Sequence, residues 1–120
     1  MSQSAMSPLE VTRQVARAFA THLARGAFAD AHALLTTTLA GQLSPSDLER
    51  EYAAMLAYLE DATADHVEVI TMLEEWPGAQ PDDLGWAYVA VAGEDWSEGV
   101  SVVVCREGDP RIRAVEWGRP

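Results

Sequence analysis

Apolar side chains recur every three or four residues through the first half of the chain, from Val11 to Leu59. This spacing is typical of amphipathic helices, because residues three and four positions apart share one helix face. Three such stripes are separated by short breaks, and the second covers about residues 28–39. The pattern therefore predicts three N-terminal helices within about residues 8–60, each with one buried face.

Two of these helices begin with the same short signature, Ser7-Pro8 and Ser44-Pro45. A serine hydroxyl accepts hydrogen bonds from free N–H groups of the first turn, and proline already has the backbone angle of that turn. A carboxylate stands three positions after each serine, as in a capping box. Gly26 supplies the stop for the first helix.

The hydrophobic rhythm changes near Asp65, where the period shortens towards two and β-branched residues become common. Turn-forming residues divide this half into four predicted strands, near residues 66–76, 85–92, 96–106 and 111–117. The short connections favour antiparallel neighbours. We therefore expect one α+β domain over residues 1–120, whose helices cover one face of an antiparallel sheet.

The third predicted strand is apolar on both faces. Val100, Val102 and Val104 share one face, and Val103 and Cys105 share the other. Apolar residues on both faces indicate cover on both sides, and the helices can cover only one. A second copy of the chain on the outer face would supply the rest, so the sequence predicts a homodimer through the sheet.

The chain is strongly acidic, with a net charge of −11. Such a charge opposes binding to phosphate backbones, so nucleic acid is not an expected partner. The excess is uneven, because residues 61–120 contain thirteen acids and four arginines. This negative field serves solubility, and it would also attract a basic protein partner.

The single cysteine, Cys105, cannot form an internal disulfide and fits a reducing compartment. The start of the chain has neither a basic stretch nor an apolar run, so we expect no secretory signal. The longest apolar run, residues 100–105, is far shorter than the roughly 20 residues that span a bilayer. A cytoplasmic protein without a membrane partner is expected.

A resemblance rests on the helical segment Phe19-Ala20-x-His22-Leu23-x-x-Gly26-x-Phe28-x-x-Ala31-His32-x-Leu34-Leu35, followed by Leu43-Ser44-Pro45-Ser46-Asp47-Leu48 and a strand meander. This arrangement resembles the nuclear transport factor 2-like superfamily, also called SnoaL-like or cystatin-like. The resemblance implies a cone-like fold, with helices lying in the concavity of a curved antiparallel sheet, and a dimer. The superfamily includes isomerases, dehydratases, ligand binders and scaffolds, so the resemblance selects no activity.

Two residues are weak candidates for acid–base chemistry. His22 lies in the middle of the apolar arc of the first helix, where it would be either a base at the floor of a pocket or a core histidine bonded to backbone. Glu116 shares strand parity with Ile112 and Ala114, so it would point into the cone if those residues face the helices. Alternatively, Glu116 lies in water at a strand end.

Aromatic residues could complete an apolar ligand pocket around these two. The predicted wall consists of Phe19, His22, Tyr52, Trp86, Tyr88 and Glu116. The alternative is that these residues are simply core. No zinc-ligand spacing or phosphate-binding loop is present, so we expect no metal and no cofactor.

Three functional hypotheses follow. The first is a non-catalytic dimeric module that holds a small apolar ligand. The second is a lyase or isomerase that uses His22 or Glu116 as general acid or base. The third is an acidic interaction protein, of the immunity or antitoxin type, for a basic partner.

Overall fold

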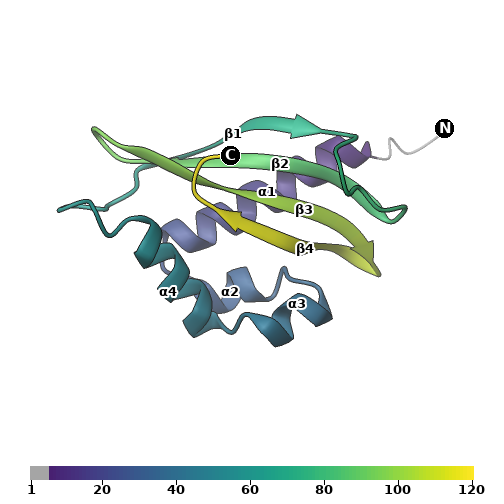
Figure 1. Ribbon diagram of the computed structural model, residues 1–120, viewed down its shortest axis with the longest axis horizontal. Coiled ribbons are helices and arrows are strands. Elements are labelled where there is room, and N and C mark those ends of the chain that lie inside the picture. The colour runs from purple at the N-terminus through teal and green to yellow at the C-terminus, as the bar shows by residue number, and fades with distance from the viewer. Residues whose placement is uncertain (1–5) are drawn as a thin grey trace.

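The structure is a computed structural model that describes residues 6–120, and it consists of helices followed by an antiparallel sheet (Figure 1). The helices are α1 (Pro8–Ala24), α2 (Phe28–His32), α3 (Thr37–Gln42) and α4 (Pro45–Met55). The strands are β1 (His66–Leu73), β2 (Asp83–Ala92), β3 (Ser97–Glu107) and β4 (Asp109–Trp117). The predicted α+β class and the four-stranded sheet are confirmed. No helix in the described part of the chain is long and apolar enough to cross a membrane.

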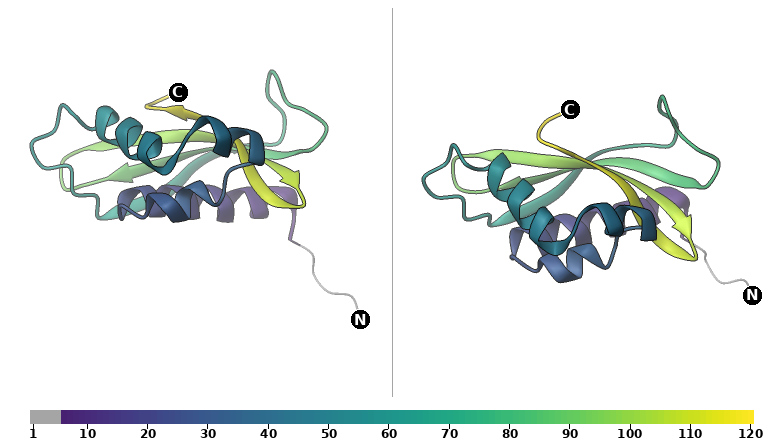
Figure 2. Two further views of the ribbon diagram at one scale, coloured as in Figure 1. Left: turned by 90° about the horizontal axis from the view of Figure 1, so that it is seen from below. Right: turned by 60° about the horizontal axis from the view of Figure 1, so that its bottom comes forward.

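The sheet has the strand order β1-β2-β3-β4, and every neighbouring pair is antiparallel. Helix α1 lies across one face, which we call the inner face, and it contacts all four strands. Helices α3 and α4 contact β4, so the smaller helices gather at that end of the sheet (Figures 1 and 2). The opposite face, called the outer face, has no helix across it and is turned towards the viewer in Figure 1.

The core fills the space between α1 and the inner face. Alternate residues of β2 and β3, including Val89, Val91 and Val102, point towards the helices and are at most 2% exposed. Phe19 of α1 is completely buried among them. The apolar faces of α1 and of the strands therefore pack against each other in one core, as the hydrophobic pattern predicts.

The second predicted helix, over about residues 28–39, is divided into α2 and α3. The chain between these helices pairs with the edge of β4 instead: the N–H of Thr36 donates to the carbonyl of Ile112 at 2.8 Å, and the N–H of Ile112 donates to the carbonyl of Leu34 at 2.8 Å. The Thr36 hydroxyl then caps α3 by accepting from the N–H of Leu39 at 3.2 Å. The prediction of one continuous helix is wrong, because a partner distant in the sequence provides the backbone bonds that a helix would otherwise make.

Helix α4 begins with a complete capping box. The Ser44 hydroxyl accepts from the N–H of Asp47 at 3.1 Å, and the Asp47 carboxylate accepts from the N–H of Ser44 at 3.0 Å. The hydrogen bond from the Ser44 N–H, and next the one from Arg50, lower the pKa of Asp47 below its ordinary value. The predicted start of a helix at Pro45 is therefore confirmed.

Replacing Ser44 with alanine removes one side of this capping box. We expect the free energy of unfolding to fall by about 1 kcal/mol, because a first-turn N–H loses its acceptor. Urea unfolding followed by tryptophan fluorescence measures the change. Ser46→Ala, at an exposed position inside the same first turn, is the matched control and should change stability by less than about 0.5 kcal/mol. Equal losses in the two variants would contradict the capping role.

Candidate functional site

The outer face of the sheet gathers apolar and aromatic side chains from neighbouring strands. One row crosses all four strands at the paired positions Leu73, Trp86, Val103 and Ala114. The next row is Thr71, Tyr88, Ser101 and Glu116. These residues alternate with the core residues, so they point away from α1. The centre of the outer face is therefore apolar in the first row and more polar towards β4 in the second.

Large side chains on this face are only partly covered. Trp86 and Tyr88 are half-buried, and Leu73 is 39% exposed. Tyr88 also lies over Gly99, where an added Cβ would be 2.8 Å from the tyrosine hydroxyl and ring. The small neighbour leaves room for the tyrosine ring, which leans along the sheet towards Gly99.

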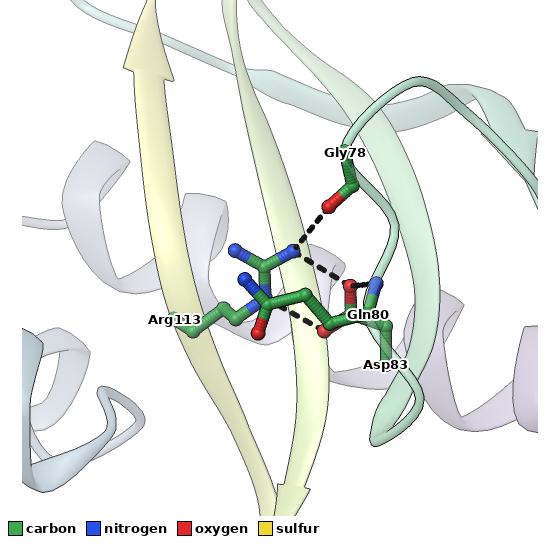
Figure 3. A network of polar contacts seen from close by, with 4 residues as sticks. All are labelled: Gly78, Gln80, Asp83 and Arg113. Atoms are coloured by element: carbon green, nitrogen blue, oxygen red, sulfur yellow. Dashed lines mark hydrogen bonds and ion pairs between the residues drawn. The ribbon is translucent and has the colours of Figure 1, made fainter.

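An ion pair stands at one end of the outer face (Figure 3). The Arg113 guanidinium on β4 donates two hydrogen bonds of 2.6 Å, one to each carboxylate oxygen of Asp83 on β2. The Asp83 side chain is only 3% exposed, and it also accepts from the N–H of Gln80 at 2.8 Å. Arg113 reaches the carbonyl of Gly78 as well, at 3.4 Å. The pair thus ties the β1–β2 loop to β4 and leaves no net charge of its own on this face.

Cys105 lies beside this ion pair, on β3. Burial, and next the negative charge of Asp83, raise the pKa of its thiol. The thiol therefore stays protonated near neutral pH and is a poor nucleophile. Among the described residues, no group of histidine, cysteine and carboxylate side chains could hold a metal ion.

The residues predicted to form a ligand pocket are divided between the two faces of the sheet. Phe19 is part of the core, and Tyr52 packs against Phe28 with ring centroids 6.3 Å apart. Trp86 and Tyr88 instead point outward. The six predicted wall residues therefore do not surround a single space.

Tyr52 has one unusual feature. Its hydroxyl oxygen is buried and has no hydrogen-bond partner in the described part of the chain. Burial raises the pKa of this hydroxyl, so it stays protonated. The Tyr52 ring accordingly serves as packing between α2 and α4, not as an ionised group.

Glu116 does not face the helices. A register shift in β4 places Ile112 opposite Val104 but Ala114 opposite Val103, so Arg113 is the extra residue of a bulge. Beyond the bulge the parity is reversed, and Glu116 is exposed on the outer face. His22, half-buried in the last turn of α1, belongs to the helix layer on the other side of the sheet. The two candidate acid–base residues are thus separated by the sheet.

The surface hollows of the molecule lie elsewhere. One hollow of about 430 Å³ lies between α1 and β1, and another of about 470 Å³ lies near Asp83 and Glu107. None of the six predicted wall residues lines either of them. These two hollows therefore lie along α1 and near the Asp83–Arg113 pair, and not among the residues predicted to line an interior pocket.

Comparisons with known proteins found no matching family model, no matching curated protein and no matching solved structure. The resemblance to nuclear transport factor 2-like domains consequently remains an expectation from helix spacing and strand order. Two surfaces of the fold are open to a partner: the outer face of the sheet and the groove between α1 and β1. Of these, the outer face was expected from the sequence, because β3 is apolar on both faces.

The Asp83–Arg113 pair was not expected from the sequence. Arg113 interrupts the apolar positions Ile112 and Ala114 of β4, and a charged residue within such a run was the available signal. Its partner is thirty positions away and follows a turn, so only the sheet register brings the two together.

Proposed function

We propose that this chain is a non-catalytic module of the nuclear transport factor 2-like type that forms a homodimer through the outer face of its sheet. The observation that carries the proposal is the row of Leu73, Trp86, Val103 and Ala114, which crosses all four strands without a covering helix. Leu73 and half-buried Trp86 supply most of its accessible apolar surface, because Val103 is only 8% exposed. Burying such a row removes apolar surface from water, at about 25 cal/mol per Å². A second copy of the same chain is the commonest occupant of such a surface, because most soluble oligomers are twofold homodimers.

The charge distribution supports a second copy as the occupant. A twofold interface places identical surfaces against each other, so the like charges of a chain with a net charge of −11 would repel across it. The first row carries no charge, and Asp83 and Arg113 neutralise each other nearby. Glu116 in the second row is exposed on the same face, so close contact between two acidic chains is favoured at the first row and not at the β4 end of the second.

The enzyme hypothesis receives less support. His22 and Glu116 lie on different sides of the sheet, so within a single chain each would have to act as general acid or base without the other. An interior ligand pocket also has little support, since the six residues predicted to line it lie on both faces of the sheet and do not surround one space. Native mass spectrometry after gentle purification remains the test for a retained apolar ligand.

A charge-insertion variant tests the dimer. Leu73→Glu combined with Thr71→Glu places two carboxylates on the outer face, at positions that are exposed in the isolated chain. Sedimentation equilibrium at micromolar concentration should give twice the chain mass for the wild type. For the variant we expect a dimer dissociation constant at least about tenfold higher, because two carboxylates per chain would be desolvated at the interface.

The matched control is Gln14→Glu combined with Gln42→Glu, which adds the same charge at exposed positions on α1 and α3. Its dissociation constant should stay within about threefold of the wild-type value. A wild-type monomer at 100 μM protein or above, or equal weakening by both double variants, would remove the basis for the proposed function.

A further inference from the structure

A row of exposed arginines follows helix α1, in spite of the acidic character of the chain. Arg13 and Arg17 are one turn apart, Thr21 stands one turn further on, and Arg25 caps the helix. The ion pairs of residues 6–120 involve Arg50, Arg111, Arg113 and Arg119, and none of them involves the arginines of this row. The helix dipole favours a cation at Arg25, near the C-terminus, but it gives no reason for Arg13 or Arg17.

These arginines line a groove between α1 and the edge of the sheet. A hollow of about 430 Å³ is lined by Arg17, Thr21 and Arg25 together with the start of β1. A second hollow of about 330 Å³ continues it and is lined by Arg13, Arg17 and residues 66–69. Arg17 and Val67 belong to both hollows, so the groove is continuous. It also contains Asp65 and Glu68, and Glu68 is 3.2 Å from the His66 ring.

The other wall of this groove is β1, a free edge strand. At the opposite edge of the sheet, residues 34–36 pair with β4. No segment of the described chain pairs with the edge of β1 that points away from β2, and this edge is the upper edge of the sheet in Figure 1. Alternate residues of an edge strand direct their N–H and C=O groups outward, where they can bind another extended chain.

The spacing of the arginines matches such a chain. Four residues of an α-helix rise by about 6 Å, and alternate residues of a strand are about 6.6 Å apart. A strand added beside β1 would therefore present every second side chain to one turn of α1. Arg13, Arg17 and Arg25 would meet the first, second and fourth of these side chains, with Thr21 opposite the third.

We propose that the groove between α1 and β1 binds an acidic, extended segment of a protein partner, which adds to β1 as a fifth strand and directs its carboxylates towards Arg13, Arg17 and Arg25. Backbone hydrogen bonds to β1 provide the affinity, and the arginine row selects carboxylates because guanidinium groups bind them with two parallel hydrogen bonds. A nucleic acid is a poorer occupant, because it has no peptide backbone and would leave the strand edge unpaired. The site lies at the sheet edge and is independent of the proposed dimer.

A labelled peptide tests this directly. The probe is a fluorescein-labelled ten-residue peptide that alternates Glu and Thr, and its fluorescence anisotropy is measured with the full chain at 0.15 M salt, where charges beyond about 8 Å are screened. We expect saturable binding below about 1 mM protein, and at least tenfold weaker binding to the Arg17→Ala/Arg25→Ala variant. The control variant Arg50→Ala/Arg106→Ala loses the same charge elsewhere and should bind within about twofold of wild type.

Two further arms separate the elements of the proposal. A peptide that alternates Lys and Thr should bind more tightly to the variant Arg17→Glu/Arg25→Glu than to Arg50→Glu/Arg106→Glu, which has the same net charge, so the difference reports the groove and not the acidity of the chain. A Glu–Thr peptide with N-methyl groups at alternate amides keeps its charge but cannot form a ladder, and it should bind at least tenfold more weakly. The proposal is overturned if the Glu–Thr peptide does not bind, or if the arginine variant and its control bind it equally well. It is also overturned if the N-methylated peptide binds as tightly as the Glu–Thr peptide, or if a ten-nucleotide oligo-dT binds more tightly.

Discussion

Replacing Arg113 with alanine is expected to lower the free energy of unfolding by about 2–4 kcal/mol. The variant leaves the Asp83 carboxylate, whose side chain is 3% exposed, without its cation and without two hydrogen bonds of 2.6 Å. It also releases the carbonyl of Gly78 and with it the β1–β2 loop (Figure 3). Urea unfolding monitored by tryptophan fluorescence measures the loss. Arg106→Ala, an exposed neighbour on β3, is the control and should change stability by less than about 0.5 kcal/mol.

The loss should depend on pH. Hydrogen bonds from Arg113 chiefly hold the pKa of Asp83 below its ordinary value of 3.8, against the opposite effect of burial. A carboxyl group with a lowered folded-state pKa stabilises the fold above its unfolded-state pKa, and this stabilisation disappears as the pH falls through the folded-state value. The difference between wild type and Arg113→Ala should therefore shrink as the pH falls from about 7 to about 3. A pH-independent difference, or one that grows in acid, would show that the ion pair is not its cause.

Replacing Gly85 with valine is expected to cost about 3 kcal/mol or more. Gly85 on β2 faces α1, and an added Cβ would be 2.5 Å from the Thr12 hydroxyl and 3.1 Å from two of its carbons. Thr12 cannot move aside easily, because it is completely buried and its hydroxyl donates to the carbonyl of Pro8 at 2.8 Å. The whole helix would have to move away from the sheet. Thermal and urea unfolding measure the effect.

A double variant distinguishes this clash from a general effect of losing glycine. Thr12→Ala removes the hydroxyl and the methyl group that a Cβ at position 85 would meet and leaves only the Cβ of residue 12, at 3.1 Å. Gly85→Ala should therefore be less damaging in the Thr12→Ala background than in the wild type. Gly41→Ala is the second control, since no atom lies within 4 Å of its added Cβ and the position is in α3. That variant should be stabilised by about 0.5–1 kcal/mol. Additive losses at positions 12 and 85 would contradict the close approach of α1 to β2.

Local signals in the sequence were sufficient for most of the fold. The Ser44-Pro45 signature predicted where α4 begins, and the change of rhythm near Asp65 predicted the start of the sheet at His66. Strand ends differ from the predicted ones by several residues at most: β1 ends at Leu73 instead of residue 76. Turn residues fix a strand boundary only approximately, because the last backbone pairs depend on the partner strand.

The failures have a common physical cause, which is pairing between residues distant in the sequence. Leu34 and Leu35 continue the helical stripe, so only the bond between Thr36 and Ile112 reveals why α2 stops. The bulge at Arg113 reverses the parity of β4 and moves Glu116 to the outer face. Neither the end of α2 nor the bulge changes the spacing of apolar residues in the sequence. The prediction that Glu116 faces the pocket assumed a regular β4, in which every second residue lies on the same face.

An isotope-filtered NOE experiment on a mixture of labelled and unlabelled chains shows whether two copies meet through the outer face of the sheet. We expect intermolecular contacts from the side chains of Leu73 and Trp86, at protein concentrations where sedimentation shows a dimer. The absence of such contacts in a dimeric sample, or intermolecular contacts only from α1 and α4, would contradict the proposed interface.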